Sequence, residues 1–308
     1  MDPPRVLALS AAAHSRSALE RSPELARWAA FTAECFADKT NPPLAAYFTS
    51  KVLNDPFFEP TRDIVVATLR DGVTVVAALR VFHRRINGMD VLGIGEVGVA
   101  KQYRGQGIAT QLVDFALALW QPACALLHAS LPAARKTYAR SGFVPLAPLV
   151  TFRLPRGRAT TPRVLRSVGA HDAEALAALY AQHLSCIHGV FERSAQYFAR
   201  WVVPRWERKG RAFICDTCYI YLLRRDEGWQ VDEFAGPFRV FASALTRALC
   251  DVGAHADSHV LISGGLYAHL FQATAQADRL CAVSADDGWM AWGASGLATD
   301  VVFDSDSF

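Results

Sequence analysis

A glycine-rich turn at residues 104–109 is the part of this sequence whose residue types and spacing best suit chemistry. It follows an apolar run and precedes a helical one, so several backbone amides are expected to lie without partners at the start of a helix. Such amides, together with the partial positive charge of the helix end, bind phosphate or pyrophosphate groups. Lys101 and Arg104 would add full positive charges, and glycine avoids a Cβ that would hold the ligand away. The predicted donors are the amides of Gly105, Gln106, Gly107, Ile108 and Ala109.

Three kinds of cofactor-binding turn compete for this segment. A P-loop requires a lysine after its second glycine, and none follows Gly107, which argues against nucleotide hydrolysis. Residues 93–98 match the Gly-x-Gly-x-x-Gly dinucleotide fingerprint, but they lie inside a predicted strand and not at the start of a helix. The third pattern is Arg-x-x-Gly-x-Ala, formed by Arg104, Gly107 and Ala109. The simplest alternative for any such turn is that it only connects two secondary-structure elements and binds no ligand.

The residues before the turn predict an antiparallel meander. Two runs rich in β-branched residues, 64–69 and 73–79, are joined by an Asp-Gly pair at Gly72. A second hairpin is expected at Gly88, because Asp-Gly and Asn-Gly pairs favour tight turns. The last strand, at 91–99, leads directly into the glycine-rich turn.

The elements after the turn favour one family. Residues 108–120 place apolar side chains on one helical face, 123–129 read as a buried strand, and a short helix is expected to end at Gly142. The order β-β-β-turn-α-β-α, the Arg104 turn and a later Tyr-x-x-x-Gly-Phe pattern from Tyr138 resemble the GCN5-related N-acetyltransferase (GNAT) superfamily. The resemblance implies an acyl-CoA site and an α+β fold, in which helices flank a mixed, mostly antiparallel twisted sheet.

The second half of the chain repeats part of this order. A boundary is expected near residues 154–162, where Pro and Gly interrupt the periodicity. Gly236 and Pro237 stand where the second unit would need its anion-binding turn, and proline lacks one donor. We therefore predict a catalytic GNAT domain at 1–155 and a degenerate GNAT-like domain at 156–308 that shapes the acceptor cleft. The expected elements are helices at 171–184, 193–206 and 238–250, and strands at 213–223, 230–234 and 260–262.

The pairing of an active with a degenerate unit resembles the tandem enhanced-intracellular-survival acetyltransferases without their third domain. Residues 97–99 and the Arg104 turn carry the similarity in the first domain. The weaker similarity of the second domain rests on Tyr180, Gly189, Arg193 and Trp201. The resemblance supports the two-domain plan, but it does not transfer the relatives' substrates or oligomeric state.

Acyl transfer and the family resemblance together imply roles for individual residues. The leaving CoA thiolate benefits from an acid, and Tyr138 matches the position of the family's acid. Aromatic packing beside Phe143 is the structural alternative for Tyr138. The backbone of Val97, Gly98 and Val99 would align the pantetheine arm and polarise the thioester carbonyl.

Several groups could serve as the base that takes a proton from the attacking amine. Glu96 precedes the pantetheine-binding end of its strand. It could take the proton from the amine directly or through a water, or it could hold the positive charge of the amine. The structural alternative is that Glu96 is an ion-paired residue of the strand. His128 ends the next strand and has a suitable pKa range, although a hydrogen-bonded structural histidine is commoner. In the tandem relatives the C-terminal carboxylate of the chain enters the active site. Here that carboxylate belongs to Phe308, although an acidic tail at a chain end is ordinarily frayed.

The seven cysteines are spread along the chain and read as reduced, mostly buried thiols. None is adjacent to the glycine-rich turn, although Cys124 lies on the neighbouring strand, so we expect direct attack without a covalent enzyme intermediate. Cys215 and Cys218 form a CxxC pair within one strand-like run, 212–223. Residues three apart in a strand face opposite sides, which predicts a structural role for both.

Composition limits the partners. The net charge of +3 over 308 residues gives no argument for nucleic acid, and no apolar run is long enough for a membrane span. No signal peptide is recognised at Met1, and with reduced thiols this predicts a cytoplasmic protein. No metal site is expected, and the sequence leaves open whether the protein forms a homo-oligomer.

The predicted activity is acyl-CoA-dependent N-acyl transfer, most simply from acetyl-CoA, to a primary amine of a small or medium-sized molecule. The alternatives are a non-catalytic acyl-CoA-binding sensor and a protein lysine or N-terminal acetyltransferase.

Overall fold

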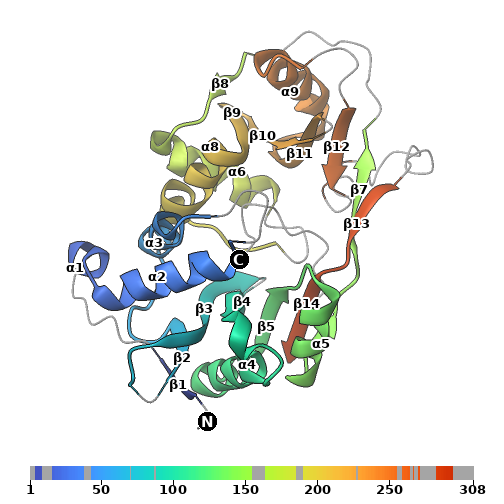
Figure 1. Ribbon diagram of the computed structural model, residues 1–308. Coiled ribbons are helices and arrows are strands. Elements are labelled where there is room, and N and C mark those ends of the chain that lie inside the picture. Colours follow the sequence, from blue (N-terminus) through green and yellow to red (C-terminus); the bar gives the residue numbers. More distant parts are fainter. Residues whose placement is uncertain are drawn as a thin grey trace.

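The fold consists of two sheet-and-helix units stacked on each other (Figure 1). It is seen in a computed structural model that describes residues 4–8, 16–37, 43–69, 71–86, 88–154, 164–184, 190–226, 228–254, 259–263, 266, 270 and 282–293. The expected domain boundary at 155/156, Gly189 and the terminal Phe308 lie outside the described residues. The mixed α+β class and the two mostly antiparallel sheets confirm the predicted fold class.

The first sheet has the strand order β1-β2-β3-β4-β5-β14-β6. Its neighbours are antiparallel except β4 and β5, which run parallel. The predicted meander, the buried strand after it and the turn between them are confirmed, and the dinucleotide-like 93–98 segment lies inside β4. The strands are β1 (Arg5–Ala8), β2 (Ile64–Thr68), β3 (Val75–Ile86), β4 (Met89–Val99), β5 (Cys124–His128), β6 (Val144–Pro145) and β14 (Trp289–Gly293).

Helices cover both faces of the first sheet, because its central strands are apolar on both sides. On β2, Val65 and Ala67 pack in the cluster that contains α4, whereas Ile64 and Val66 pack against α2 and α3. Helices α4 and α5 match the two predicted helices; β1 and α1–α3 were not predicted. The helical segments are α1 (Arg16–Glu20), α2 (Pro23–Cys35), α3 (Ala45–Asn54), η1 (Lys101–Tyr103), α4 (Ile108–Trp120) and α5 (Pro132–Arg140).

The second sheet has the order β13-β7-β12-β11-β10-β9-β8. Its parallel pair, β11 and β12, is linked through α9 just as β4 and β5 are linked through α4, so the second unit repeats the topology of the first. The strands are β7 (Leu149–Arg153), β8 (Arg166–Ser167), β9 (Gly210–Cys215), β10 (Cys218–Arg225), β11 (Gly228–Ala235), β12 (His259–Ser263) and β13 (Ala282–Asp286).

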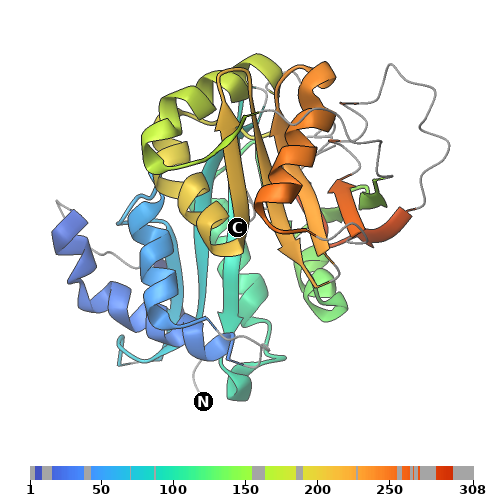
Figure 2. The ribbon, with the colours of Figure 1, turned by 90° about the horizontal axis from the view of Figure 1, so that it is seen from above.

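Helix α9 lies on the outer face of this sheet, and the other helices of the unit lie on the face toward the first unit (Figures 1 and 2). The predicted helix 193–206 is a continuous helical segment, but Phe198–Val202 form a π-helical turn within it. The segments are η2 (Ala170–Asp172), α6 (Ala173–His183), α7 (Ala195–Tyr197), η3 (Phe198–Val202), α8 (Val203–Lys209) and α9 (Phe238–Asp251).

The CxxC pair is placed differently from the prediction. The run 212–223 is not one strand, because β9 and β10 meet in a tight turn that leaves Cys215 and Cys218 opposite each other. Their Sγ atoms lie 3.5 Å apart. The argument that the two thiols face opposite sides was therefore wrong, since a two-residue turn between the cysteines folds the run back on itself.

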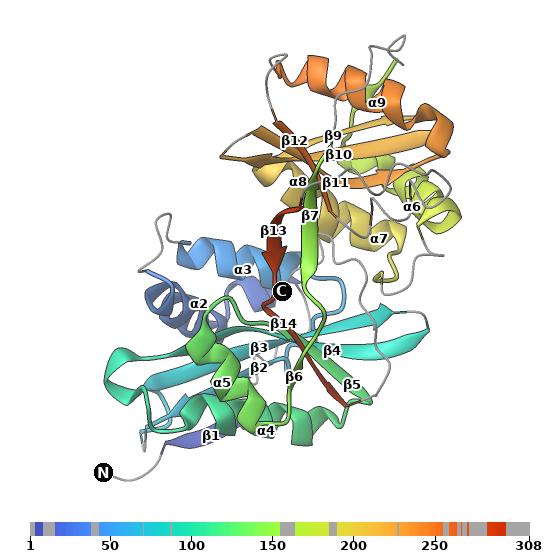
Figure 3. The ribbon, with the colours of Figure 1, turned by 90° about the vertical axis from the view of Figure 1, so that its right-hand side faces the viewer.

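The two sheets exchange strands across the region of the expected boundary. Strand β7 comes before residue 155 but pairs in the second sheet, between β12 and β13. Strand β14 comes from the end of the described chain but pairs in the first sheet, between β5 and β6. Figure 3 shows β7 and the β13–β14 segment crossing between the units side by side. The division at 155/156 remains a proposal, in which each unit receives one strand from the other half of the chain.

Helix α3 carries the contact between the units. Arg200 in η3 donates from Nη2 to the carbonyl oxygen of Leu53 at 2.7 Å. Phe82 of β3 belongs to the buried cluster of the second unit, with its ring centroid 6.1 Å from that of Trp201. The bridge between Ile86 and Phe191 adds a backbone link. Within the described part of the chain, no helix is long and apolar enough to cross a bilayer.

Candidate active site

The glycine-rich turn opens α4 as the sequence indicates. Gly105 and Gly107 have φ angles of +80° and +78°, a region that residues with a Cβ rarely adopt. Helix α4 begins at Ile108, and the Gly107 carbonyl accepts from the amide of Gln111 at 3.1 Å. Among the described residues, no acceptor faces the amides of 105–109. The turn thus presents a row of exposed donors at the positive end of a helix.

Arg104 ties the turn to the strand before it. Its Nε donates to the carbonyl oxygen of Val99 at 3.0 Å, while its side chain stays exposed to solvent. Gln106 makes a second link, from Nε2 to the carbonyl oxygen of Gln102 at 3.3 Å. Both contacts lie within the segment itself, so the charge of Arg104 remains available to an anion on the turn.

Strands β4 and β5 part next to this turn. Their parallel pairing ends at Ile94 and Leu127, whereas β4 continues to Val99 while paired only with β3. The residues beyond Ile94 therefore have one edge without a neighbouring strand. An extended ligand can add to such an edge through backbone hydrogen bonds. The predicted pantetheine-binding positions Val97 and Val99 stand on this stretch.

Gly98 is required by a close approach of helix α2. A Cβ at this position would lie 2.9 Å from both Cβ and Sγ of Cys35, the last residue of α2. Real Cβ atoms do not approach other atoms that closely, so any larger residue would push α2 away from β4. Helix α2 thereby fixes the backbone of the strand edge.

A β-bulge sets the position of Glu96. The register between β3 and β4 shifts between Ala78, which faces Gly98, and Arg80, which faces Gly95. Glu96 lies in this irregularity with a φ angle of +56°, and its side chain is buried. A non-glycine residue in this region stores backbone strain and is over-represented at functional sites. The prediction placed Glu96 by strict alternation, which the bulge breaks.

The Glu96 carboxylate forms a buried ion pair with Lys51 of α3. The Nζ–Oε1 distance is 2.5 Å, and the two side chains are 6% and 4% exposed. Apart from this ion pair, neither carboxylate oxygen has a hydrogen-bond partner among the described residues, although both are buried. Such acceptors are costly to bury and can bind an N–H group that enters the site.

Lys51 itself lies in an unusual electrostatic setting. Burial, together with the nearby charges of Arg205 and Arg80, lowers the pKa of its ammonium to about 8, against the opposing effect of Glu96. The ammonium also lies 5.3 Å from the centre of the Phe82 ring. Lys51 therefore holds its proton weakly and can change charge near neutral pH.

Tyr138 lies in the core of the first unit. It is 8% exposed and belongs to the buried cluster that contains Ile94 and Leu127, the pair at which β4 and β5 part. Its ring packs edge-on against Phe143, with centroids 6.4 Å apart. Burial raises its pKa to about 12, so the phenol keeps its proton at neutral pH. No described residue hydrogen-bonds its hydroxyl group, which leaves that donor available.

His128 stands at the end of β5 and is held by the second half of the chain. Its Nε2 lies 2.9 Å from both carboxylate oxygens of Asp286, the last residue of β13. Its ring packs against Trp289 with centroids 5.2 Å apart. His128 thus has a structural partner, and this contact does not bring it to the Lys51–Glu96 pair.

Two cysteines belong to elements that frame the site. Cys35 packs against Gly98, a proximity that the sequence could not reveal, and Cys124 opens β5. Burial raises the pKa of each thiol to about 11. Both remain protonated near neutral pH and are poor nucleophiles. This agrees with direct attack by the amine.

Sequence reasoning missed Lys51, Cys35 and Asp286, because each reaches the site from an element distant in sequence. A single lysine in an amphipathic helix gives no signal of its own, since most such residues are solvated. Among the described residues, no group of three or more His, Cys, Asp or Glu side chains is arranged to hold a metal ion.

Comparison with known proteins agrees with this geometry. Residues 60–145 match the model of the acetyltransferase (GNAT) domain family, a stretch that runs from just before β2 into β6. It contains the meander, the glycine-rich turn, α4 and Tyr138. No curated protein sequence matches the chain.

Solved structures extend the similarity over both units. A GCN5-related N-acetyltransferase from Anabaena variabilis ATCC 29413 has a TM-score of 0.66 at 15% identity, covering 93% of this chain and 72% of that one. Eis1 from Mycobacterium abscessus has a TM-score of 0.60 at 15% identity over 96% and 74%. The N-myristoyltransferase of Saccharomyces cerevisiae, solved with bound myristoyl-CoA, has a TM-score of 0.58 at 11% identity over 99% and 88%. At these identities the likeness concerns the fold. The family model therefore identifies residues 60–145 as an acetyltransferase (GNAT) domain, and a second sheet-and-helix unit is joined to it.

Proposed function

We propose that this protein is an acyl-CoA-dependent N-acyltransferase. Its simplest donor is acetyl-CoA, and its acceptor is a primary amine of a small or medium-sized molecule. Residues 1–155 form the catalytic unit, and 156–308 form a degenerate unit that walls the acceptor cleft. The amine attacks the thioester carbon directly, CoA leaves as the thiol, and no covalent enzyme intermediate forms. A cytoplasmic location belongs to the same proposal.

The observation that carries the proposal is the free edge of β4 beside the exposed amides of the turn. The amides of Gly105 and Gly107 and their neighbours would bind the pyrophosphate of CoA. From there the pantetheine arm would run along the edge that β5 leaves open after Leu127. The backbone at Val97 and Val99 would align the arm and polarise the thioester carbonyl.

Tyr138 would act as the acid. Its hydroxyl has no described partner, and its pKa of about 12 keeps it protonated at neutral pH, so it is available as a donor. The phenol would donate a hydrogen bond to the sulfur of CoA as negative charge develops there, and this would ease departure of the thiolate, which ends as the thiol with a proton released by the attacking amine. The position of Tyr138 in the cluster beneath the parting strands supports this role.

Glu96 would act on the amine. Its buried carboxylate oxygens could accept an N–H of the amine, and Lys51 would hold the carboxylate in place. His128 is a weaker candidate, because Asp286 and Trp289 already engage its ring. Single replacements distinguish the two candidate bases: Glu96→Gln should lower kcat strongly, whereas His128→Gln should retain most of the wild-type kcat.

The proposal is tested by CoA release from acetyl-CoA in the presence of amines, compared with release in their absence. An amine-dependent release whose product is the N-acetylated amine supports the transferase. A chain that binds acetyl-CoA tightly but transfers to neither small amines nor peptides would instead be an acyl-CoA-binding sensor. A preference for peptides would favour a protein lysine or N-terminal acetyltransferase.

A further inference from the structure

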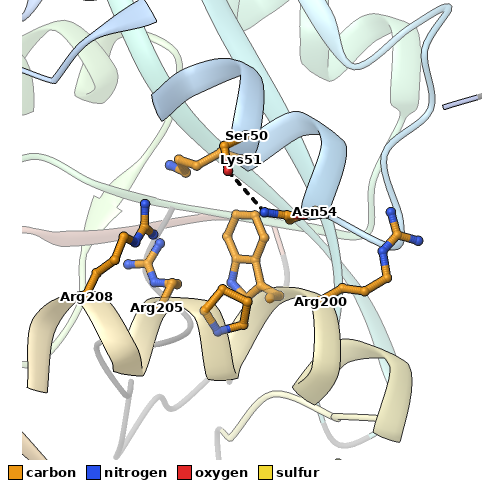
Figure 4. A pocket seen from close by; sticks show the side chains of 8 residues that line it. Ser50, Lys51, Asn54, Arg200, Arg205 and Arg208 are labelled. Carbon is orange, nitrogen blue, oxygen red and sulfur yellow. Dashed lines mark hydrogen bonds between the residues drawn. The ribbon is translucent and has the colours of Figure 1, made fainter. Parts of the chain in front are cut away.

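A cleft between the two units is lined by basic side chains and by no carboxylate. It lies between α3 and the η3–α8 segment, and it measures about 380 Å³ including its open mouth. Figure 4 shows Lys51 on the α3 side and Arg200, Arg205 and Arg208 on the opposite helix. Trp201 forms part of the wall between them. We call this the basic cleft.

Two of these arginines lack a carboxylate partner. Arg200 donates to the backbone carbonyl of Leu53, and the guanidinium of Arg208 lies 5.0 Å from the centre of the Tyr47 ring. Neither forms an ion pair with a described residue. Arg200 and Arg208 thus bring two positive charges to the cleft that no described carboxylate neutralises, and a bound anion would offset their repulsion. The cleft therefore has the charge of an anion-binding site.

Lys51 connects the basic cleft to the proposed reaction centre. Its side chain lines the cleft, while its ammonium contacts Glu96 in the bulge beside Val97. A molecule in the cleft would thus meet Lys51 on one side and the arginines of η3 and α8 on the other, with Glu96 behind Lys51. The second unit supplies those arginines, which gives it a definite part in the site.

We propose that the acceptor is a small amine that also carries a carboxylate or phosphate group. This inference rests on the proposed function and specifies its substrate class. The anionic group would bind the arginine side of the basic cleft, because guanidinium groups match carboxylate and phosphate geometry. The amine end would then face Glu96.

The same charges favour the reactive form of the acceptor. The positive charges of the cleft disfavour a further cation, so they lower the pKa of the bound amine and increase its neutral, nucleophilic fraction, against the opposing effect of Glu96. Polyamines and other polycations would be repelled. The cleft has room for a small group only and excludes a folded protein surface.

Binding tests the inference without requiring turnover. The full-length protein, saturated with a non-reactive desulfo-CoA, is titrated calorimetrically with four probes: phosphoethanolamine, β-alanine, ethanolamine and putrescine. The first two should bind at least about tenfold more tightly than ethanolamine, as expected for a charge-assisted contact. Putrescine should bind most weakly. Their ranking distinguishes phosphate from carboxylate as the preferred anion.

Charge variants locate the contact. Arg208→Gln, in an exposed arginine of the cleft, should remove most of the preference for anionic probes, and Arg200→Gln should act in the same direction. The matched control is Arg239→Gln, which removes an exposed arginine on α9, at the far face of the second sheet. Circular dichroism melting shows whether each variant is folded.

The outcomes separate this inference from the proposed function. Equal binding of neutral and anionic probes, or a preference that survives in both cleft variants, would overturn the anionic acceptor. Anion-selective binding that is lost in Arg208→Gln supports it, whatever the rate of acyl transfer. If these probes bind selectively and the chain never releases CoA with any amine, the transferase proposal fails and the anion site stands.

Discussion

Lys51 Nζ and Glu96 Oε1 lie 2.5 Å apart in the interior, although one residue is on α3 and the other in the bulge of β4. This contact links the helix that faces the second unit to the strand edge proposed to bind pantetheine. It therefore joins acceptor recognition to the reaction centre through a single side chain. A buried ion pair of this kind costs desolvation energy and stabilises little by itself. Its presence here favours a functional reason.

The pair should make stability depend on alkaline pH in a specific direction. The pKa of Lys51 is lowered from 10.5 to about 8, so the unfolded state binds more protons than the folded state between these values. Stability therefore rises with pH across this window, by about 1 kcal/mol between about pH 7.5 and pH 9 from this residue alone.

Urea unfolding at the two pH values measures this contribution. The control is the double variant Lys51→Met/Glu96→Gln, in which both charges are absent and other titrating groups, including the thiols, are unchanged. The wild type should gain about 1 kcal/mol relative to the double variant as the pH rises. Equal slopes in the two proteins would show that Lys51 titrates normally.

The glycine-rich turn gives a prediction about CoA affinity. Gly107→Ala puts a Cβ on a residue with a φ angle of +78°, which costs about 1–2 kcal/mol in stability, and the added methyl group would hold a phosphate away from the amides of the turn. Binding of CoA, measured by calorimetry, should weaken by about tenfold or more.

A second turn supplies the matched control. Gly72 has a φ angle of +69° in the β2–β3 connection, and, as at Gly107, nothing lies within 4 Å of an added Cβ. Gly72→Ala should lower the melting temperature by a similar amount while CoA affinity is unchanged. If both variants lost CoA equally, backbone strain alone would account for the effect and the turn would not be the binding site.

The contact between Gly98 and Cys35 predicts a coupled pair of substitutions. Gly98→Ala would place a Cβ 2.9 Å from Sγ of Cys35, and overpacking of this kind costs about 1–3 kcal/mol. Cys35→Ala removes Sγ and should restore part of that loss, because Cβ of residue 35 remains close. A double-mutant cycle by urea unfolding measures the coupling. Strictly additive effects would mean that α2 moves freely against β4.

The second unit has a buried ion pair that should matter only for stability. Arg193 Nη1 lies 2.8 Å from Glu233 Oε1, both side chains are fully buried, and Tyr219 donates to the same carboxylate. Glu233→Gln removes the charge that compensates Arg193 and should cost about 3–5 kcal/mol in unfolding free energy. Below its melting temperature the variant should keep CoA affinity; a loss there would give the second unit a direct part in CoA binding.

Local patterns in the sequence were enough for most of the first unit. β-Branched runs, an Asp-Gly turn and a helix with one apolar face predicted β2, β4, β5 and α4 to within a few residues, whereas β3 continues to Ile86, past the predicted end at residue 79. The anion-binding turn was also predictable, because its function depends on glycines adjacent in sequence. The GxGxxG segment was correctly placed in a strand by the same local reasoning.

Long-range contacts could not be predicted in this way. The exchange of β7 and β14 between the sheets depends on pairing between segments more than a hundred residues apart. The approach of Lys51 to Glu96 depends on how α3 packs and on a bulge that breaks strand alternation. The two-residue turn between Cys215 and Cys218 escaped notice because the strands on both sides are equally apolar.

The most direct test of the central claim is CoA release from acetyl-CoA with amine acceptors, for wild type and Tyr138→Phe side by side. The hydroxyl of Tyr138 has no described partner, so its removal should leave folding and CoA affinity unchanged. We predict amine-dependent release by the wild type and a fall in kcat of about a hundredfold in the variant, as expected for loss of a general acid. Equal kcat values in the two proteins would remove Tyr138 from the mechanism. Tight CoA binding with no amine-dependent release by the wild type would contradict the transferase itself.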